Sequence, residues 1–298
     1  MRILVLGGAG LTGSKVVSEA SRKGYEVYAT YRNTPPPPSS KAVWIRTDVD
    51  EPESIRKLLD EVKPDAVIDM HAFNKVDDCE DVGKEQCWKT NAVSPGLWAK
   101  ECSRRGVKYL TVSTDFVFDG ENPPYSEDSI PRPLSQYAVS KLVGEQRALL
   151  EGAIVLRTAV VYDADKRSKF PGWVIRNVME GKRIGVFVDQ WNNPTLARDL
   201  AHASILAIEE LKGPILLHAV GRECASRYSF AMEIVRVLGL DEDLLEATCS
   251  CRVNQKAKRP HKACLKTTKI EDVLGFVPRG YREALRDVSS ELKEVWMS

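Results

Sequence analysis

The sequence contains no long apolar segment and no excess of charge of either sign. None of its apolar runs approaches the roughly 18 residues that a membrane-spanning helix requires, so no membrane partner is expected. Its 43 basic residues nearly balance its 42 acidic residues, which gives a net charge of +1. Without a large positive field, nucleic acid is not expected as the main partner. The composition, 43% hydrophobic and 29% charged, is typical of a globular protein.

Ordered cysteine motifs are also missing. The seven cysteines are an odd number and are scattered along the chain. Cys249 and Cys251 are too close for the usual metal or redox spacing, and no second pair completes a zinc pattern. We therefore expect no metal site, and we expect free thiols in a reducing cytoplasm.

Apolar strands alternate with amphipathic helices through the first half of the chain. The expected strands are nearly continuous in apolar character, as strands covered on both faces are: Arg2–Leu6, Glu26–Tyr31, Ala42–Arg46, Ala66–Asp69, Lys108–Ser113 and Ile154–Thr158. Helices are expected between them at Thr12–Lys23, Glu51–Val62, Val82–Arg105 and Pro133–Leu150. This alternation predicts an α/β fold with a Rossmann-type, doubly wound parallel sheet.

The chain changes character after Thr158, where strand signals become rarer. Helices are expected at Leu196–Leu211, Arg227–Leu238 and near Tyr281–Trp296. We therefore expect a core over residues 1–158 and a smaller C-terminal lobe, mainly over residues 159–298, that is interleaved with the core.

Three glycines follow the first expected strand at intervals of three. Gly7 allows a sharp turn, Gly10 allows a pyrophosphate to approach the backbone, and Gly13 allows the next helix to pack against the sheet. The free N–H groups of that helix then favour an anion. The pattern predicts a dinucleotide cofactor at the start of this helix.

The second strand indicates which cofactor binds. A carboxylate at its end would favour NAD, but this strand is followed directly by Arg32, which can pair with the 2′-phosphate of NADP. NADP is therefore predicted, and NAD stays open. Asp48 after the third strand either contacts the adenine or caps the following helix.

Two short stretches carry groups suited to proton transfer. Tyr137 and Lys141 lie four residues apart, on one face of a helix. An ammonium beside a phenol favours the phenolate, so the pKa of Tyr137 is expected below its usual value of about 10. Ser113 or Thr114, at the end of the fifth strand, can hydrogen-bond the same substrate oxygen.

These motifs carry a specific family resemblance. Residues 113–145, STDFVFDGENPPYSEDSIPRPLSQYAVSKLVGE, closely resemble the dTDP-4-dehydrorhamnose reductase family of extended short-chain dehydrogenases, as do Gly7–Gly13, Asn91–Ser94 and Asp189–Thr195. The chain also resembles a relative of that family, the regulatory β subunit of methionine adenosyltransferase. The similarity extends over nearly the whole sequence.

The resemblance implies reduction of the 4-keto group of a nucleotide-linked 6-deoxyhexose by NAD(P)H. It implies that Tyr137 donates the proton, Lys141 assists it and Thr114 orients the ketone. The implied cofactor contacts are Gly7, Gly10, Leu11, Thr12, Gly13, Arg32, Asp48, Val49, His71, Ala72, Asn91, Ser113, Tyr137 and Lys141. The implied substrate contacts are Thr114, Asp115, Trp191 and Arg198.

One departure leaves other functions open. Many members have a tryptophan where this chain has Val160, in a position that contacts substrate. A non-catalytic, NADP-binding regulatory subunit and a nucleotide-sugar epimerase or dehydratase of the same fold therefore remain alternatives. The sugar, the nucleotide, and the choice between monomer and homodimer stay open. A basic cluster is either a solvated loop or a wall that neutralises a substrate diphosphate; it comprises Lys256, Lys258, Arg259, His261 and Lys262.

Overall fold

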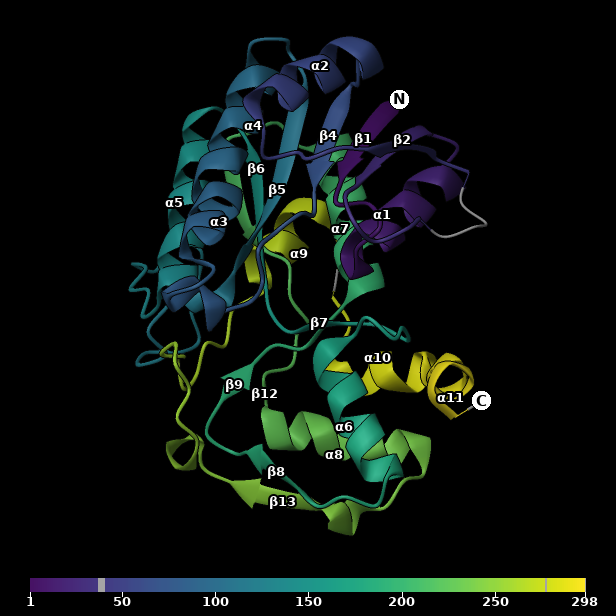
Figure 1. Cartoon of the computed structure of the whole chain (residues 1–298), viewed down its shortest axis with the longest axis vertical. Helices are drawn as coiled ribbons and strands as arrows, with labels where there is room; N and C mark the ends of the chain where they lie inside the picture. The colour runs from purple at the N-terminus through teal and green to yellow at the C-terminus, as the bar shows by residue number, and fades with distance from the viewer. Residues whose placement is uncertain (37–40, 277, 298) are drawn as a thin grey trace.

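The computed structural model describes residues 1–36, 41–276 and 278–297. Its centre is a seven-stranded parallel sheet in the order β11-β6-β5-β4-β1-β2-β3 (Figure 1). The strands are β1 (Arg2–Leu6), β2 (Glu26–Tyr31), β3 (Val43–Arg46), β4 (Ala66–Asp69), β5 (Lys108–Thr114), β6 (Ile154–Thr158) and β11 (Ile215–His218). The direction of winding reverses between β1 and β4, as in dinucleotide-binding sheets. The expected Rossmann-type α/β fold is therefore confirmed.

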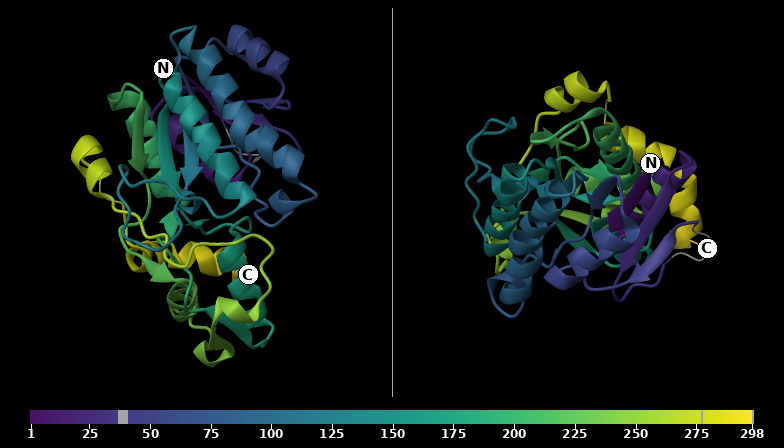
Figure 2. Two further views of the ribbon diagram at one scale, coloured as in Figure 1. Left: turned by 90° about the vertical axis from the view of Figure 1, so that its left-hand side faces the viewer. Right: turned by 90° about the horizontal axis from the view of Figure 1, so that it is seen from above.

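Helices cover both faces of this sheet (Figure 2). One layer contains α1 (Leu11–Arg22), α7 (Ala197–Glu210) and α9 (Thr268–Leu274), and the other contains α2 (Pro52–Val62), α4 (Ser94–Ser103) and α5 (Gln136–Leu150). Side chains alternate between the two faces of a strand, so Ile3 and Val5 join the first layer while Leu4 and Leu6 join the second. Both faces of β1 are buried, which explains its continuous apolar sequence.

The single helix expected over residues 82–105 is interrupted. It consists of α3 (Lys84–Trp88), a π-helical segment η2 (Lys89–Val93) and α4. Pro95 lies in the first turn of α4 and has no backbone N–H, so the regular hydrogen-bond ladder cannot pass through it. The π-helical segment carries Asn91. Such segments are frequent at functional sites.

The second lobe packs a separate core beneath the sheet. Its helices are α6 (Lys169–Met179), α8 (Arg227–Leu238), α10 (Tyr281–Asp287) and α11 (Ser289–Met297). Three short strand pairs accompany them: β7 (Val161–Tyr162) with β10 (Thr195–Leu196), β8 (Ile184–Phe187) with β13 (Leu245–Thr248), and β9 (Trp191–Asn192) with β12 (Ala225–Ser226). Single-turn helices are η1 (Asp78–Glu80), η3 (Asp115–Val117), η4 (Glu242–Leu244) and η5 (Ser250–Arg252). Since α7, α9 and β11 return to the main sheet, the chain after Thr158 contributes to both lobes.

The expectation of free cysteines is wrong for four of the seven. Disulfides join Cys79 to Cys87 and Cys224 to Cys264, while Cys102, Cys249 and Cys251 are free. The fold brings the Cα atoms of each pair to 5.6 and 5.7 Å, although the second pair is 40 residues apart in sequence. The inference of a reducing compartment therefore loses its basis. Within the described parts of the chain, no helix is long and apolar enough to span a bilayer.

Candidate active site

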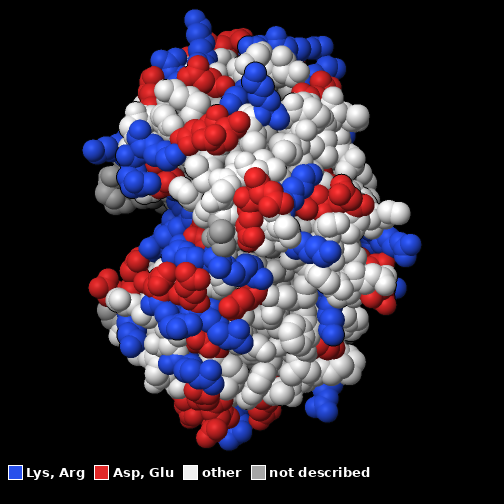
Figure 3. Space-filling model, turned by 180° about the vertical axis from the view of Figure 1, so that it is seen from behind, with Lys and Arg blue, Asp and Glu red and all other residues white. Residues whose placement is uncertain are grey.

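A cavity of about 1250 Å³ lies between the two lobes, at the carboxyl ends of the sheet strands. The glycine turn and the ends of β2, β4 and β5 form its upper wall. Residues of α6, β8 and the β13–α9 connection form its lower wall. In Figure 3, basic side chains gather beside the indentation between the lobes. Ligands of open α/β sheets bind in this position, where the strand order reverses.

The glycine turn fits a diphosphate closely. Gly7 has a φ of +67°, and a Cβ there would lie 3.0 Å from backbone and side-chain atoms of His71. A Cβ on Gly13 would collide with the carbonyl oxygen of Gly7. Because α1 begins at Leu11, the N–H groups of Leu11, Thr12 and Gly13 have no partner within the helix. Together with Gly10 these residues line the cavity and offer donors to an anion.

Arg32 and Asp48 lie at the far end of the cavity. Their side chains are 55% and 38% exposed, and Arg32 Nη1 lies 3.4 Å from Asp48 Oδ2. Asp48 Oδ1 accepts a hydrogen bond from the backbone of Asp50 at 3.1 Å, whereas Glu51 occupies the N-cap position of α2. Asp48 is therefore a cavity residue and does not cap this helix.

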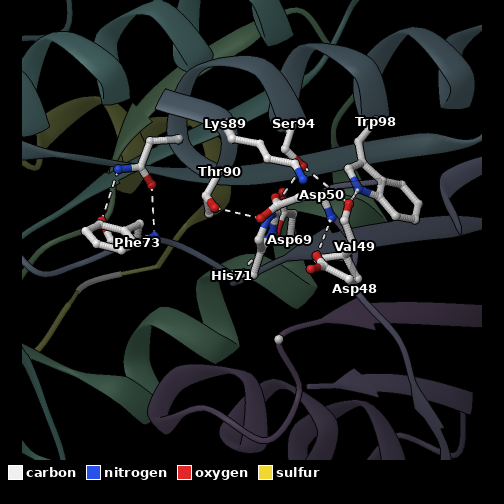
Figure 4. A network of polar contacts seen from close by, with 12 residues as sticks. Asp48, Val49, Asp50, Asp69, His71, Phe73, Lys89, Thr90, Ser94 and Trp98 are labelled. Atoms are coloured by element: carbon white, nitrogen blue, oxygen red, sulfur yellow. Dashed lines mark hydrogen bonds and ion pairs between the residues drawn. The ribbon is translucent and has the colours of Figure 1, made fainter. Parts of the chain in front are cut away.

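His71 lies in a buried ionic network that joins the ends of β3 and β4 (Figure 4). Its Nε2 lies 3.0 Å from Asp50 Oδ1, and its Nδ1 contacts Asp69 Oδ1. Burial by itself would lower the pKa of His71, but the two carboxylates outweigh it and raise this pKa to about 10. The hydrogen bond from His71 overcomes the burial of Asp50 and lowers the pKa of that carboxyl to about 2. His71 is therefore an imidazolium between two carboxylates.

The same network fixes the neighbouring backbone. Asp50 Oδ2 also accepts hydrogen bonds from Thr90 Oγ1 at 2.6 Å and from Gln86 Nε2 at 3.0 Å. These bonds attach the loop after β3 to the helical segment that carries Asn91. Val49, His71 and Ala72 line the cavity next to this network.

The residues expected to transfer a proton meet at one wall. Thr114 ends β5, while Tyr137 and Lys141 project from the first turns of α5. Ser135 caps that helix by accepting a hydrogen bond from Ala138 N at 3.3 Å. All three expected catalytic residues line the cavity. Lys141 Nζ donates to the carbonyl oxygen of Val112 at 2.7 Å rather than to an acidic side chain.

The expected low pKa of Tyr137 is not what the structure shows. Burial raises the pKa of Tyr137 to about 12, and its hydrogen bond with Thr114 only partly opposes this shift. Burial also lowers the pKa of Lys141. Desolvation is therefore the largest influence on the pKa of each of the two groups. The phenol is held in its protonated form, which is the form that can donate a proton.

Two buried hydroxyls in the cavity wall have no hydrogen-bond partner among the residues that the structure describes. They are Ser113 Oγ at the end of β5 and Thr158 Oγ1 at the end of β6. A buried polar atom without a partner costs about 1–3 kcal/mol, so a polar ligand at this wall would be favoured. These hydroxyls and the glycine turn fit a dinucleotide that extends from Arg32 to Tyr137.

Three residues implied by the family resemblance are not in the cavity wall. Asn91 is buried behind it, where its amide bonds the backbone N–H and carbonyl of Phe73, each at 3.0 Å. Trp191 packs against Lys262, whose Nζ lies 5.6 Å from the ring centroid. Arg198 pairs with Asp163 and Glu291. These partners lie 18 to 93 residues away in sequence, so the sequence alone could not reveal that they hold the three side chains outside the cavity wall.

The second lobe supplies cavity residues that the sequence did not reveal, among them Phe170, Trp173 and Arg227, and one from the expected basic cluster. Phe170 and Trp173 from α6 lie with ring centroids 6.0 Å apart, and the Arg227 guanidinium lies 5.1 Å from the Phe170 ring. Of the basic cluster, Arg259 lines the cavity and also pairs with Asp77. These residues come from α6, α8 and the β13–α9 connection, so no single local motif marks the group.

Asp115 lies between this aromatic and basic part of the cavity wall and the part that carries Thr114 and Tyr137. It is buried and accepts a hydrogen bond from Asn192 Nδ2. Burial raises its pKa to about 6, while Asn192 and Arg227 act in the opposite direction. The cavity thus runs from the glycine turn, past Tyr137 and Asp115, to two arginines and two aromatic rings.

A parallel sheet with this glycine turn, a strand-end hydroxyl and a tyrosine–lysine pair on one helix defines an NAD(P)-dependent oxidoreductase of the extended short-chain dehydrogenase type. The family model described as the RmlD substrate binding domain matches residues 1–294. The chain belongs to this family.

Individual relatives agree over nearly the whole chain. A probable low-salt glycan biosynthesis reductase, Agl14, from Haloferax volcanii is 31% identical and covers 92% of this chain and 93% of its own length. Methionine adenosyltransferase 2 subunit beta from Rattus norvegicus is 29% identical, covering 95% and 87%. A dTDP-4-dehydrorhamnose reductase structure from Clostridium acetobutylicum superposes with a TM-score of 0.86 at 26% identity, covering 98% and 100%. The chain is therefore similar to a glycan biosynthesis reductase, to a dTDP-4-dehydrorhamnose reductase and to a methionine adenosyltransferase subunit.

Proposed function

We propose that this protein uses NADPH to reduce the 4-keto group of a nucleotide-diphospho-6-deoxyhexose. The observation that carries the proposal is the continuity of one cavity: Thr114, Tyr137 and Lys141 lie between a dinucleotide cradle and a basic, aromatic wall. A relative from Clostridium acetobutylicum with this architecture is named a dTDP-4-dehydrorhamnose reductase. When bound, the reduced nicotinamide supplies the hydride.

The chain's own residues handle the proton. Tyr137 is protonated, because its pKa is about 12, and can give its O–H proton to the ketone oxygen as the carbonyl carbon is reduced. Thr114 Oγ1 donates a hydrogen bond to the same ketone oxygen and holds it in line. The Lys141 ammonium stabilises the phenolate that results until a solvent proton restores the phenol.

The remaining walls suit the other parts of the substrate. Arg227 and Arg259 provide positive charge for a diphosphate, and Phe170 and Trp173 provide flat surfaces for a base. Arg32 favours the 2′-phosphate of NADPH. The small side chain of Val160 lines the cavity and leaves room at the position where many relatives have tryptophan.

A steady-state assay tests the proposal. NADPH consumption should require a 4-keto-6-deoxy sugar linked to dTDP or UDP, and comparison of the two identifies the nucleotide. Tyr137→Phe should lower kcat by about 10²–10⁴-fold with NADPH affinity unchanged. Tyr28→Phe is the control, since the Tyr28 hydroxyl bonds Glu26 away from the cavity.

The similarity to the methionine adenosyltransferase β subunit supports a second candidate, a cofactor-binding regulatory subunit. That function predicts NADPH binding without turnover of any sugar nucleotide. Conversion of a sugar nucleotide without net NADPH consumption would instead indicate an epimerase or dehydratase. Either result would contradict the proposed reduction.

A further inference from the structure

A loop of the second lobe reaches the glycine turn of the first. The connection between β7 and α6 passes beneath α1 (Figure 1). Arg167 in this loop donates from Nη1 to the carbonyl oxygens of Ala9 at 2.6 Å and Gly10 at 3.1 Å. Its Nη2 donates to Ser14 Oγ at 3.0 Å. One side chain from the second lobe therefore contacts the turn on both sides of the start of α1.

The loop holds this arginine firmly. Asp165 accepts from Arg167 Nε at 2.8 Å and from Nη2 at 2.5 Å, so all five guanidinium N–H groups have acceptors. Asp163 is fully buried and accepts from Arg198 at 3.0 Å and lies 3.4 Å from Lys15 Nζ of α1. The loop is thus attached to the core at two points.

These contacts determine what the turn offers to a ligand. With the carbonyl oxygens of Ala9 and Gly10 bound to Arg167, the unpaired N–H groups at the start of α1 are left to face the cavity. Arg167 also lines that cavity, so its positive charge lies beside any phosphate held there. Carbonyl oxygens without this partner would repel an anion.

We propose that Arg167 is a positioning residue for the cofactor diphosphate and makes cofactor affinity depend on the second lobe. The inference rests on the dinucleotide site of the proposed function but not on the identity of the sugar. The part of the cofactor that Arg167 positions is the diphosphate group. The adenosine and its 2′-phosphate are expected farther away, toward Arg32.

Equilibrium titrations with NADPH, ADP and adenosine 2′-monophosphate test this, since the third ligand lacks a diphosphate. Arg167→Ala should lower the affinities for NADPH and ADP by about 10-fold, the loss expected for one charge-assisted contact. The affinity for adenosine 2′-monophosphate should change by less than about 2-fold. Lys166→Ala is the matched control, because Lys166 is exposed in the same loop and does not line the cavity. It should leave all three affinities unchanged.

Arg167→Lys separates positioning from charge. A lysine keeps the charge but cannot make the same set of hydrogen bonds, so its NADPH and ADP affinities should fall between those of the wild type and Arg167→Ala. Wild-type affinities in Arg167→Lys, unchanged affinities in Arg167→Ala, or equal weakening of all three ligands would each overturn the proposal. Because no sugar is present, a failure of the reductase assay would leave these binding results unaffected.

Discussion

Arg157 and Glu145 form a buried ion pair with two hydrogen bonds, behind the cavity wall that carries Tyr137 and Lys141. Arg157 Nε and Nη2 donate to the Glu145 carboxylate at 2.9 and 2.6 Å, and both side chains are at most 1% exposed. Glu145 lies one helical turn beyond Lys141 on α5, while Arg157 lies on β6. The pair therefore fixes the helix that carries Tyr137 to the sheet.

Breaking this pair should destabilise the protein strongly. Glu145→Gln leaves the Arg157 charge buried without its counter-ion, so the free energy of unfolding should fall by about 3–5 kcal/mol. Denaturant unfolding measures this loss. Glu242→Gln breaks an exposed pair with Arg236 and should cost less than about 1 kcal/mol. Similar losses in both variants would contradict the structural role of the buried pair.

Replacement of Arg32 should change the cofactor preference. Arg32→Ala removes the cation nearest the expected 2′-phosphate, so NADPH affinity should fall by about 10–100-fold while NADH affinity changes by less than about 2-fold. Binding titrations with both cofactors provide the measurement. Lys57→Ala, an exposed lysine on α2, controls for net charge. An equal loss for NADPH and NADH would show that Arg32 does not contact the phosphate.

The His71 network should make stability depend on alkaline pH. The folded-state pKa of about 10 lies above the ordinary value, so the stabilisation is complete below about pH 6.5 and is lost as the pH rises toward 10. Over this interval the unfolded chain releases a proton that the folded protein keeps. The free energy of unfolding should therefore fall by up to about 1.4 kcal/mol per pH unit.

Denaturant unfolding between about pH 7 and pH 9 measures this slope. His71→Gln should flatten it, whereas His202→Gln should keep it, because the side chain of His202 is 38% exposed and pairs with the half-buried Glu19. A wild-type slope in the His71 variant would refute the imidazolium assignment.

The disulfide between Cys224 and Cys264 should contribute substantially to stability. It closes a loop of 40 residues, so the double replacement Cys224→Ser and Cys264→Ser should lower the free energy of unfolding by about 2–4 kcal/mol. Cys249→Ser, which removes a free thiol, is the control. Alkylation of the denatured, unreduced protein should label three thiols. Labelling of all seven would contradict both disulfides.

Although it did not indicate β11 (Ile215–His218), the sequence by itself determined six of the sheet strands, the glycine turn and the position of Tyr137 and Lys141 four residues apart on one helix. Each of these depends on residues within one strand or within a few turns of one helix, where periodicity and short spacing act directly. In most cases the expected ends of the elements differ from the observed ends by only one to three residues, as for α1 and α5.

Only the tertiary structure decided the electrostatics and the long-range partners. The pKa of Tyr137 rises because the fold buries the phenol, and no local pattern records the depth of burial. Arg198 was expected near the substrate, yet Glu291, 93 residues away, holds it elsewhere. Arg167 reaches Ala9 across 158 residues, a contact that exists only once the two lobes have packed together.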